Sequence, residues 1–436
     1  MEEKITSFLK FIKREINSGI VLLIMTILAL ISANSPLAET YFNIFEKTIL
    51  SVDFAFWKLS KPLYYWINDG LMAIFFLLVG LEVKREILIG ELSNFKKALL
   101  PLVAALGGVL VPVIIFLIFN FDNPEYKNGW AVPMATDIAF AVGILAILKD
   151  KVSTELKIFL TSLAVVDDIA AVIAIAFFYT SDISFSYLTI AFAAWGFLFL
   201  LNKLRVRHIW IFLVIGVLFI WYPILKSGVH ATVAGVMIAF TIPLKREYLL
   251  GTFVAKVNKR LKVFDGLSLD KKYTLTDETY DAIEDIKEAC EQVGSPLQNL
   301  EHAIHNVTLY GIIPLFTFAN TGIRFESLNF GYLMSSNLVW GIFLGLLVGK
   351  ALGIGSFVML AKKIKLVTLP AKMSFRDILG AGFLAGIGFT MSIFITDLSF
   401  SDNELITTSK IAIFGASLLS GISGFVILKF RNTKNG

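Results

Sequence analysis

Two adjacent carboxylates, Asp167 and Asp168, lie in the middle of the apolar stretch 158–178, which contains no other charged residue. A charged side chain at the centre of a lipid bilayer costs roughly 3 kcal/mol or more, so acids kept at that depth usually bind an ion or a proton. Carboxylate oxygens are also ligands that small hard cations prefer. The doublet therefore predicts a site for a proton, a small cation or both. The alternative interpretation is a structural ion pair with a lysine.

Few other ionisable residues lie within the apolar stretches. Asp137 follows Thr136 in one stretch, and Lys350 is deep in another. Lys410 lies within two turns of the end of an apolar run, where its amine can reach the interface. Asp69, also near the end of a run, is interpreted as structural or interfacial.

The three interior acids and one interior base leave a surplus of negative charge at bilayer depth. Together with a neighbouring hydroxyl such as that of Thr136, this surplus suits a site for Na⁺ or Li⁺. If one pocket holds either H⁺ or Na⁺ but not both, and opens to one side of the membrane at a time, exchange of the two ions follows. No further coupling device is needed.

The composition is that of a membrane protein. Hydrophobic residues make up 56% of the 436 residues and charged residues 17%, and the mean hydropathy is +0.76. Soluble globular proteins carry about 25% charged residues. The net charge of +5 does not indicate a nucleic-acid partner, because lysine and arginine are concentrated in alternate loops. The one cysteine, Cys290, excludes an intrachain disulfide.

Apolar runs of about 20 residues, the length that crosses a bilayer as a helix, predict twelve transmembrane spans. They lie at 17–34, 63–82, 98–120, 130–148, 156–179, 185–201, 208–222, 229–243, 302–321, 333–359, 377–397 and 404–428. The first run ends in Ser-Ala-Asn-Ser-Pro and is interpreted as a span, not as a cleaved signal peptide. Lysine and arginine are enriched on the side that twelve spans assign to both termini, so both termini are predicted to be cytoplasmic.

The rest of the chain is arranged around these spans as one integral membrane domain, 1–436. The stretch 245–300 is the long polar segment of the chain and is predicted to be a cytoplasmic loop. Apolar residues at helical spacing in 279–293 predict an amphipathic helix within it. On the opposite side, the alternation of apolar and polar residues in 48–54 predicts one strand of a small hairpin.

Two spans contain residues that interrupt helices. Pro133 lies one turn before Asp137 and cannot donate a helical hydrogen bond, which predicts local unwinding there. The segment 380–388 is dense in glycine, for which close packing through small residues is the alternative interpretation. Interrupted helices in both halves of a transporter indicate an ion site near the bilayer midplane.

Six motifs are spread over nearly the whole chain. They read Asn-Asp-Gly-Leu-Met-Ala-Ile-Phe-Phe-Leu-Leu-Val-Gly-Leu-Glu-Val-Lys-Arg-Glu at 68–86, Ala-Thr-Asp-Ile-Ala-Phe-Ala at 135–141, Val-Asp-Asp-Ile at 166–169, Leu-Lys-Ser-Gly-Val-His-Ala-Thr at 225–232, Phe-Thr-Phe-Ala-Asn-Thr-Gly at 316–322 and Gly-Ile-Gly-Phe-Thr-Met-Ser-Ile at 386–393. A Thr-Asp or Asp-Asp pair alone is a weak signal, but the six together and in this order are specific. In these motifs the chain closely resembles the NhaA family of bacterial sodium/proton antiporters.

The resemblance implies a fold and a site. The fold would be an all-α polytopic membrane protein of twelve transmembrane helices, with inverted repeats and crossed interrupted helices four and eleven. Asp167 and Asp168 match the family's cation- and proton-binding pair, which would hold Na⁺. Thr136 and Asp137 match the hydroxyl and the charge at the helix crossing, and Lys350 matches the lysine that pairs with Asp167.

The resemblance also implies a physiological role. Members exchange internal Na⁺ or Li⁺ for external protons electrogenically and are switched on by alkaline pH, which serves sodium and pH homeostasis. The chain is then expected in the bacterial cytoplasmic (inner) membrane as a homodimer, with no cofactor beside the transported Na⁺, Li⁺ and H⁺. The matching pH-response residues, most of them expected in a cytoplasmic funnel, are Glu82, Arg85, Glu86, His230, Glu301, His302 and His305.

The chain departs from the family pattern at a few positions. Ala351 replaces the proline that usually follows the lysine, so the backbone near Lys350 is expected to differ. Asn306 stands where a proline often follows the second histidine. The segment 245–300 is longer than in the shortest members and lies next to Glu301, so it bears on pH activation.

Other functional classes remain as alternatives. An intramembrane aspartyl protease needs acids in Tyr-Asp and Gly-x-Gly-Asp contexts, which no predicted span has, so the chain is not expected to be an enzyme. An ion channel would conduct without a proton partner. The spacing of His302 and His305 is also typical of metal ligands, but no second cluster of ligands accompanies it, and a pH-sensing or interfacial role is favoured.

Overall fold

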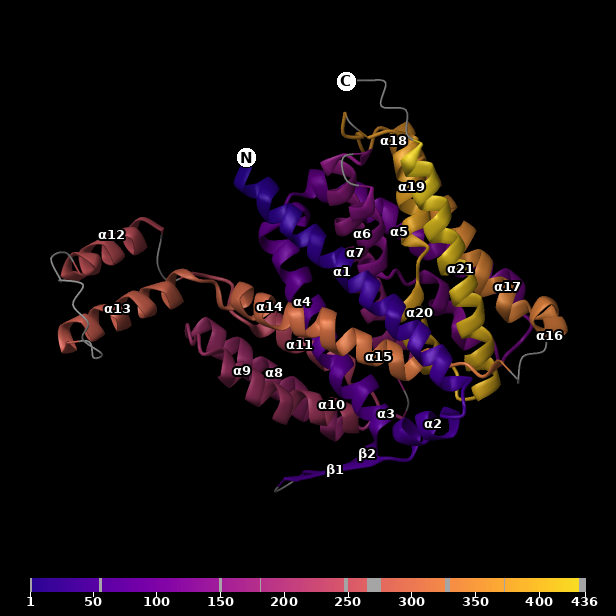
Figure 1. Ribbon diagram of the computed structural model, residues 1–436, viewed down its shortest axis with the longest axis horizontal. Helices are drawn as coiled ribbons and strands as arrows, with labels where there is room; N and C mark the ends of the chain where they lie inside the picture. The colour runs from indigo at the N-terminus through magenta and orange to yellow at the C-terminus, as the bar shows by residue number, and fades with distance from the viewer. Residues whose placement is uncertain are drawn as a thin grey trace.

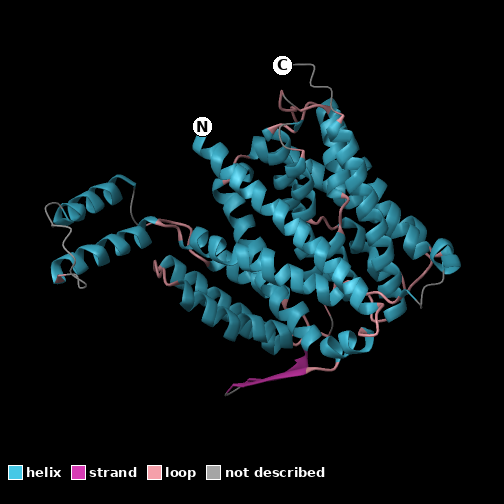
Figure 2. Ribbon diagram, viewed as in Figure 1, coloured by secondary structure: helices cyan, strands magenta, loops and turns pink. Residues whose placement is uncertain are grey.

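The computed structural model describes residues 2–54, 57–148, 151–180, 182–246, 250–264, 276–325, 330–371 and 373–430. This part of the chain is almost entirely helical, with one two-stranded hairpin (Figure 1, Figure 2). Parts of several predicted segments lie outside the described residues. They are 149–150 of one loop, 247–249 and 265–275 of the polar segment, and the C-terminal tail 431–436.

The helices follow one another with short connections. The first half contains α1 (Glu2–Ala33), α2 (Ala38–Glu46), α3 (Leu63–Tyr65), α4 (Met72–Ile89), α5 (Phe95–Asn120), α6 (Ile138–Ile147), α7 (Thr154–Phe178), α8 (Phe185–Lys203), α9 (Ile209–Gly216), α10 (Tyr222–Lys226) and α11 (Thr232–Thr241). The second half contains α12 (Leu250–Leu261), α13 (Asp277–Val293), α14 (Pro296–Val307), α15 (Ile313–Asn320), α16 (Phe330–Ser335), α17 (Asn337–Leu344), α18 (Lys350–Lys363), α19 (Phe375–Ala385), α20 (Phe389–Ser399) and α21 (Asn403–Lys429). Wide π-helical turns join several of these into longer helices, at Trp66–Leu71, Val217–Trp221, Thr308–Ile312 and Gly345–Gly349.

Several of these helices are suited to cross a membrane. In the described part of the chain, seven helices are long and apolar enough, or up to nine if each of two bent helix pairs counts as one span. The predicted spans 63–82 and 302–321 fall on helices that π-helical turns divide, and 229–243 falls on the ten-residue α11. The structure therefore confirms a helical, multi-span protein, and the full number of twelve spans stays a prediction.

A hairpin of β1 (Ile49–Phe54) and β2 (Trp57–Pro62) confirms the strand predicted at 48–54. The strands are antiparallel, with Ser51 opposite Ser60 and their hydroxyl oxygens 2.8 Å apart. The hairpin extends from the molecule on the side opposite the start of α1 and the end of α21 (Figure 1). We call this end of the molecule the hairpin side.

The polar segment 245–300 contains helices of its own. The helix α13 confirms the one predicted at 279–293, and it packs against α12. An ion pair between Arg260 and Asp285 joins them. The two helices project away from the remaining helices (Figure 1), so they add little to the buried core.

The remaining helices pack as two bundles. The first bundle contains α5, α6, α7 and α17 to α21, and the second contains α3, α4, α8 to α11, α14 and α15, whereas α1 lies against both, in contact with α6 and α15. Contacts of α4 with α7 and α15 with α20 join the bundles directly. The candidate functional residues gather at this junction.

Helices α5 and α18 of the first bundle lie in backbone contact at Gly107 and Gly353. A Cβ atom at Gly353 would lie 2.1 Å from the Gly107 carbonyl oxygen, and one at Gly107 would lie 2.2 Å from the Gly353 carbonyl oxygen. Small residues permit such close approach of helices in membranes. The contact holds the first turn of α18, and with it Lys350, against α5.

Candidate ion-binding site

Asp167 and Asp168 lie in the middle of α7, and both are buried, with 1% and 4% of their surface exposed. Consecutive residues of an α-helix point about 100° apart, because the helix has 3.6 residues per turn. The two carboxylates therefore have different neighbours. One is paired with a lysine, and the other lines a cavity.

Asp167 is held by a lysine and a hydroxyl. Its Oδ2 accepts hydrogen bonds from Lys350 Nζ at 2.5 Å and from Thr136 Oγ1 at 2.7 Å. Lys350 Nζ also lies 3.0 Å from Thr136 Oγ1, and the side chains of the ion pair are fully buried. Lys350 directly follows the π-helical turn Gly345–Gly349, and Ala351 continues α18 without a break.

The predicted helix interruptions are both present. Residues 135–137 connect a 3-10 turn to α6 in extended conformation, which confirms unwinding after Pro133. The helices α19 and α20 meet at a 47° bend, which confirms an interruption within 380–388. The two interruptions touch, because Asp137 N donates to Ile387 O at 2.6 Å.

Asp137 joins the two interrupted helices. Its Oδ1 caps α6 by accepting from Phe140 N at 3.3 Å. Its Oδ2 accepts from Thr390 N at 3.1 Å and from Thr390 Oγ1 at 2.5 Å, in the first turn of α20. The N-termini of two helices thus face one buried carboxylate, and their partial positive charge stabilises an anion there.

Asp168 lines a cavity of about 80 Å³ at the junction of the bundles. The cavity reaches from Asp168 to Glu82 on α4 and His305 on α14. Thr136 and Asp137 also line it, which places the hydroxyl and the carboxylate of the interrupted helix beside Asp168. Among the described residues, Asp168 makes no ion pair within 4 Å.

Five of the seven predicted pH-response residues gather near the Glu82 end of this cavity. Arg85 Nη1 lies 2.6 Å from Glu301 Oε1, and His305 Nδ1 lies 3.7 Å from Glu82 Oε1. Glu86 adds to the negative potential at Glu301. We call these five residues the charged cluster.

Glu301 has an unusual pKa within the charged cluster. It precedes the predicted span 302–321, and its side chain is 7% exposed. Burial raises the pKa of Glu301 to about 7, although the positive charge of Arg85 acts in the opposite direction. The carboxyl of Glu301 therefore changes its charge close to neutral pH.

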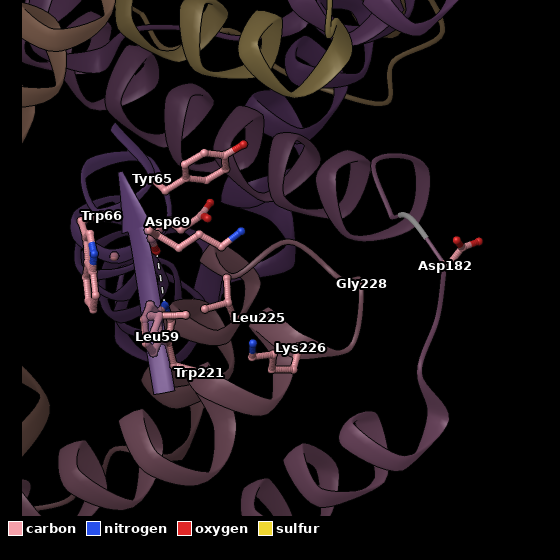
Figure 3. A pocket seen from close by; sticks show the side chains of 11 residues that line it. Leu59, Tyr65, Trp66, Asp69, Asp182, Trp221, Leu225, Lys226 and Gly228 are labelled. Atoms are coloured by element: carbon pink, nitrogen blue, oxygen red, sulfur yellow. Dashed lines mark hydrogen bonds between the residues drawn. The ribbon is translucent and has the colours of Figure 1, made fainter. Parts of the chain in front are cut away.

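The other two predicted pH-response residues lie elsewhere. His302 is exposed on the surface of α14. His230 precedes α11, and its Nε2 lies 3.2 Å from Asp69 Oδ1 on the π-helical turn before α4. Asp69 lines a hollow of about 460 Å³ beside Leu59 of β2, and the indole of Trp221 donates to its carbonyl oxygen (Figure 3).

Three buried phenylalanines from α4, α15 and α20 pack together in the core near the junction of the bundles. The ring centroid of Phe394 lies 5.6 Å from that of Phe76 and 6.0 Å from that of Phe316. Each of the three is at most 1% exposed. Phe394 lies one turn beyond Thr390 along α20, and its ring contacts His230 on the other side, with centroids 5.5 Å apart.

The sequence analysis did not predict two contacts that the structure shows. Thr390 lies within a recognised motif, but nothing in that motif indicates its bond to Asp137. Lys410 Nζ lies 3.1 Å from Asp397 Oδ1, with side chains 10% and 5% exposed, so Lys410 has an acidic partner that the sequence analysis did not assign to it. The buried carboxylate of Asp397 keeps the amine inside. The pair adds one acid and one base, so the surplus negative charge in the interior is unchanged.

Comparison with known proteins adds a sequence family. The family model of Na⁺/H⁺ antiporter 1 matches residues 9–428. The chain is 45% identical over 427 residues to the Na⁺/H⁺ antiporter NhaA of Wolinella succinogenes, which covers 97% of this chain and 93% of the relative. It is 42% identical over 424 residues to Na⁺/H⁺ antiporter NhaA 2 of Aliarcobacter butzleri, which covers 97% of each. A solved sodium proton antiporter from Methanocaldococcus jannaschii aligns over 99% of this chain and 100% of its own, with a TM-score of 0.49 and 13% identity.

Proposed function

The chain belongs to the Na⁺/H⁺ antiporter 1 family, and on that premise we propose that it carries Na⁺ or Li⁺ out of the cytoplasm in exchange for external protons. The ions would bind at Asp167 and Asp168. The single observation that supports this best is the asymmetry of the doublet. Asp167 is neutralised by Lys350, whereas Asp168 lines a cavity beside other oxygen ligands.

The exchange step is a competition at the Asp168 carboxyl. The site holds a proton on this carboxyl when no cation is bound. A Na⁺ that enters from the Glu82 end of the cavity needs the ionised carboxylate, so the O–H bond breaks as the Na⁺ binds and the proton leaves to water in the cavity. The hydroxyl of Thr136 and backbone carbonyls freed at the helix interruptions are further oxygens of the kind that Na⁺ takes.

The ion pair of Lys350 provides a route to electrogenic exchange. If Asp167 also coordinates the bound Na⁺, its ion pair with Lys350 breaks. The ammonium of Lys350 is then an isolated charge in a fully buried position, which is strongly disfavoured. The ammonium then releases a proton as well. Two protons would move for each Na⁺, and each cycle would carry a net positive charge across the membrane.

Alkaline activation is assigned to the charged cluster. Raising the pH through about 7 ionises Glu301, since burial holds its pKa near that value. The new carboxylate strengthens the pair with Arg85 and adds negative potential at the Glu82 end of the cavity. Negative potential at the mouth of a cavity raises the local concentration of cations. His302 and His230 lie away from this mouth and have no part in this assignment.

We also propose a bacterial cytoplasmic membrane location, with both termini and the charged cluster facing the cytoplasm. The start of α1 and the end of α21 lie on the side opposite the hairpin (Figure 1), which agrees with the lysine- and arginine-rich loops. A homodimer would pair the open edges of two hairpins, because Ile49, Leu50 and Val52 of β1 are 63%, 46% and 47% exposed. The mass of the detergent-solubilised protein with and without residues 49–62 tests this assembly.

Everted membrane vesicles test the exchange itself. Addition of Na⁺ or Li⁺ is expected to collapse an established proton gradient in vesicles with the wild-type protein and not in vesicles with Asp168→Asn. Asp281→Asn, an exposed carboxylate on α13, is the matched control and is expected to behave as wild type. Exchange at the wild-type rate in Asp168→Asn would refute the site. Na⁺ flux without proton counter-movement would favour a channel.

A further inference from the structure

An apolar groove of about 520 Å³ lies between α1 and α21. These two helices form its edges, and α6 and the start of α20 form its floor. Its lining contains two hydroxyl-bearing residues, Thr26 and Ser417, and one glycine, Gly421, and the other side chains are apolar. Within the described part of the chain, the groove shares no lining residue with the cavity at Asp168, so it is a separate feature.

Each edge of the groove is one face of a helix. On α1 the edge contains residues 23, 26, 27 and 30, and on α21 it contains residues 414, 417, 418, 421, 422 and 425. Positions three and four residues apart lie on the same face of an α-helix. From Phe414 to Phe425 the groove follows α21 for about 16 Å, at 1.5 Å per residue. It therefore runs along the helices.

The groove lies in the part of the protein that crosses the membrane. Helix α21 is long and apolar enough to span a bilayer, α6 belongs to another such span, and α1 and α20 belong to the two bent pairs. At the edges, Leu23 and Ile27 of α1 are 53% and 48% exposed, and Leu418 and Ile422 of α21 are 65% and 51% exposed. Side chains of a span at this depth face the hydrocarbon of the bilayer. The groove therefore opens to lipid acyl chains.

The lining of the groove suits an alkyl chain. Thr26 Oγ1 donates to Leu22 O at 2.8 Å, and Ser417 Oγ accepts from Phe389 N at 3.2 Å. A buried water makes about three hydrogen bonds to polar groups, and two hydroxyls that already bond to the backbone do not provide them. An alkyl chain needs no hydrogen bond and gains dispersion contacts with the apolar lining.

A positive charge lies at one end of the groove. Lys429 Nζ is 5.4 Å from the ring centroid of Phe425, the last groove residue on α21. Lys429 is exposed and is the last residue of α21, an end that lies opposite the hairpin side (Figure 1). A lysine at the end of a span reaches the level of the lipid headgroups. An apolar groove that ends at a cation matches an acyl chain that ends at a phosphate.

We propose that this groove binds one acyl chain of a glycerophospholipid, whose phosphate pairs with Lys429. The lipid comes from the leaflet at the C-terminal end of α21. A lipid that only surrounds the protein contacts exposed side chains. The chain of the bound lipid also contacts Ile387 and Phe389 in the floor, which are 3% and 8% exposed. The binding does not rest on the proposed exchange function.

The floor of the groove adjoins the helix interruptions. The ring centroid of Phe389 lies 4.9 Å from that of Phe140 and 5.4 Å from that of Phe414. Phe140 N donates to Asp137 Oδ1, and Thr390, the residue after Phe389, donates to Asp137 Oδ2. A chain in the groove thus packs against the residues that hold α6 and α20 together.

Photo-crosslinking from a lipid tests the binding. The protein is reconstituted in phosphatidylglycerol vesicles that contain a small fraction of phosphatidylglycerol with a diazirine on its acyl chain. Peptide mass spectrometry locates the adducts after illumination. The test variant is Leu418→Trp, whose larger side chain fills the groove from its edge. The matched control is Leu419→Trp, because Leu419 is the adjacent residue on α21, 43% exposed, and does not line the groove.

The expected result is an adduct on Ile387 or Phe389 in the wild type and in Leu419→Trp, and its loss in Leu418→Trp. Adducts confined to exposed side chains of the wild type would show surrounding lipid only and would overturn the proposal. So would an adduct on Ile387 or Phe389 that persists in Leu418→Trp at the wild-type level. If Leu418→Trp does not fold, Leu23→Trp on the opposite edge replaces it, with Ile24→Trp as its control.

The phosphate contact has a test of its own. Lys429→Gln is expected to lower the yield of the adduct on Ile387 or Phe389, whereas Lys363→Gln, at the exposed end of α18, is expected to leave it unchanged. A diacylglycerol with the same diazirine chain and no phosphate is expected to label the wild type and Lys429→Gln equally. Equal yields from phosphatidylglycerol in Lys429→Gln and Lys363→Gln would refute the role of Lys429.

The outcomes also separate the lipid site from the proposed function. Labelling requires no transport, so a protein that is labelled in the groove but exchanges no ions would leave the lipid site standing and refute the exchange. A protein that exchanges ions but is not labelled on Ile387 or Phe389 would refute the lipid site alone.

Discussion

At the scale of single residues, the doublet works because its two carboxylates differ. Asp167 has a fully buried ammonium 2.5 Å from its Oδ2, whereas Asp168 lines the cavity. The first acid is thereby occupied by a basic partner, and the second remains available to a proton or a cation. The same chemistry in two adjacent residues serves two roles because a helix turns them toward different neighbours.

The first prediction concerns the buried ion pair. Lys350→Ala leaves Asp167 without a cation, and removal of one partner of a buried pair costs about 3–5 kcal/mol. The double variant Asp167→Asn with Lys350→Met removes both charges and is expected to recover most of the lost stability. Thermal unfolding in detergent measures both, with the surface variant Lys362→Met as the control. Unaltered stability in Lys350→Ala would show that the pair is not formed.

The second prediction concerns Glu301 and pH. Burial raises its pKa to about 7 from the 4.5 of an exposed glutamate, so the unfolded chain loses its proton first. The contribution of Glu301 to the free energy of unfolding therefore falls as the pH rises from about 4.5 through 7, and it is lowest above pH 7. Glu301→Gln is expected to remove both that fall and the part of alkaline activation with a midpoint near pH 7. The measurements are the unfolding temperature from about pH 4.5 to 8.5 and the exchange rate from pH 6 to 8.5.

The exposed Glu288 on α13 supplies the control for this experiment. Glu288→Gln is expected to keep the wild-type pH profile, since its side chain lies in the projecting pair of helices. A Glu301→Gln profile that overlays the wild-type profile would remove Glu301 from the activation mechanism. The transport site would be unaffected by that result.

At the scale of elements, the site depends on where helices stop and how closely they approach. The interruptions at 135–137 and 386–388 free the backbone beside the doublet, and Asp137 ties them together. Proline and dense glycine made these breaks predictable, because both have recognisable local effects on a helix. The bond between Thr390 and Asp137 was not predictable, since it joins residues 253 positions apart.

Other elements were harder to predict for physical reasons. Asp397 lies at the end of an apolar run and therefore resembles an interfacial acid, and only the packing of α21 reveals its lysine. The spans 63–82 and 302–321 read as continuous apolar helices, but π-helical turns widen them at Trp66–Leu71 and Thr308–Ile312. Hydropathy carries no signal for such turns. Twelve spans, inverted repeats and a helix crossing thus remain predictions.

The third prediction concerns the contact of α5 with α18. Gly353→Ala would place a Cβ atom 2.1 Å from the Gly107 carbonyl oxygen and force the helices apart, at a cost of about 1–3 kcal/mol. The shift would also move Lys350 away from Asp167, so exchange should slow. Gly196→Ala on α8 is the matched control, because nothing lies within 4 Å of its new Cβ. Its stability should be unchanged or higher, by up to about 1 kcal/mol. Equal stability of the two variants would contradict the close approach.

At the scale of the whole molecule, the candidate site lies at the junction of two helix bundles. The cavity at Asp168 extends to Glu82 and His305 of the charged cluster, and the rings of Phe76, Phe316 and Phe394 pack together nearby. A single site between two bundles can serve both faces if the bundles move relative to each other.

The central claim is that H⁺ and Na⁺ compete for one buried carboxylate pair, and calorimetric Na⁺ binding to the purified protein tests it most directly. Titrations from pH 6 to 9, in two buffers with different ionisation enthalpies, give the affinity and the number of protons released. We expect at least one proton released per Na⁺, an affinity that falls up to about tenfold per pH unit on acidification for each proton released, and neither effect in Asp168→Asn. Na⁺ binding of equal affinity at every pH, with no proton released, would contradict the account.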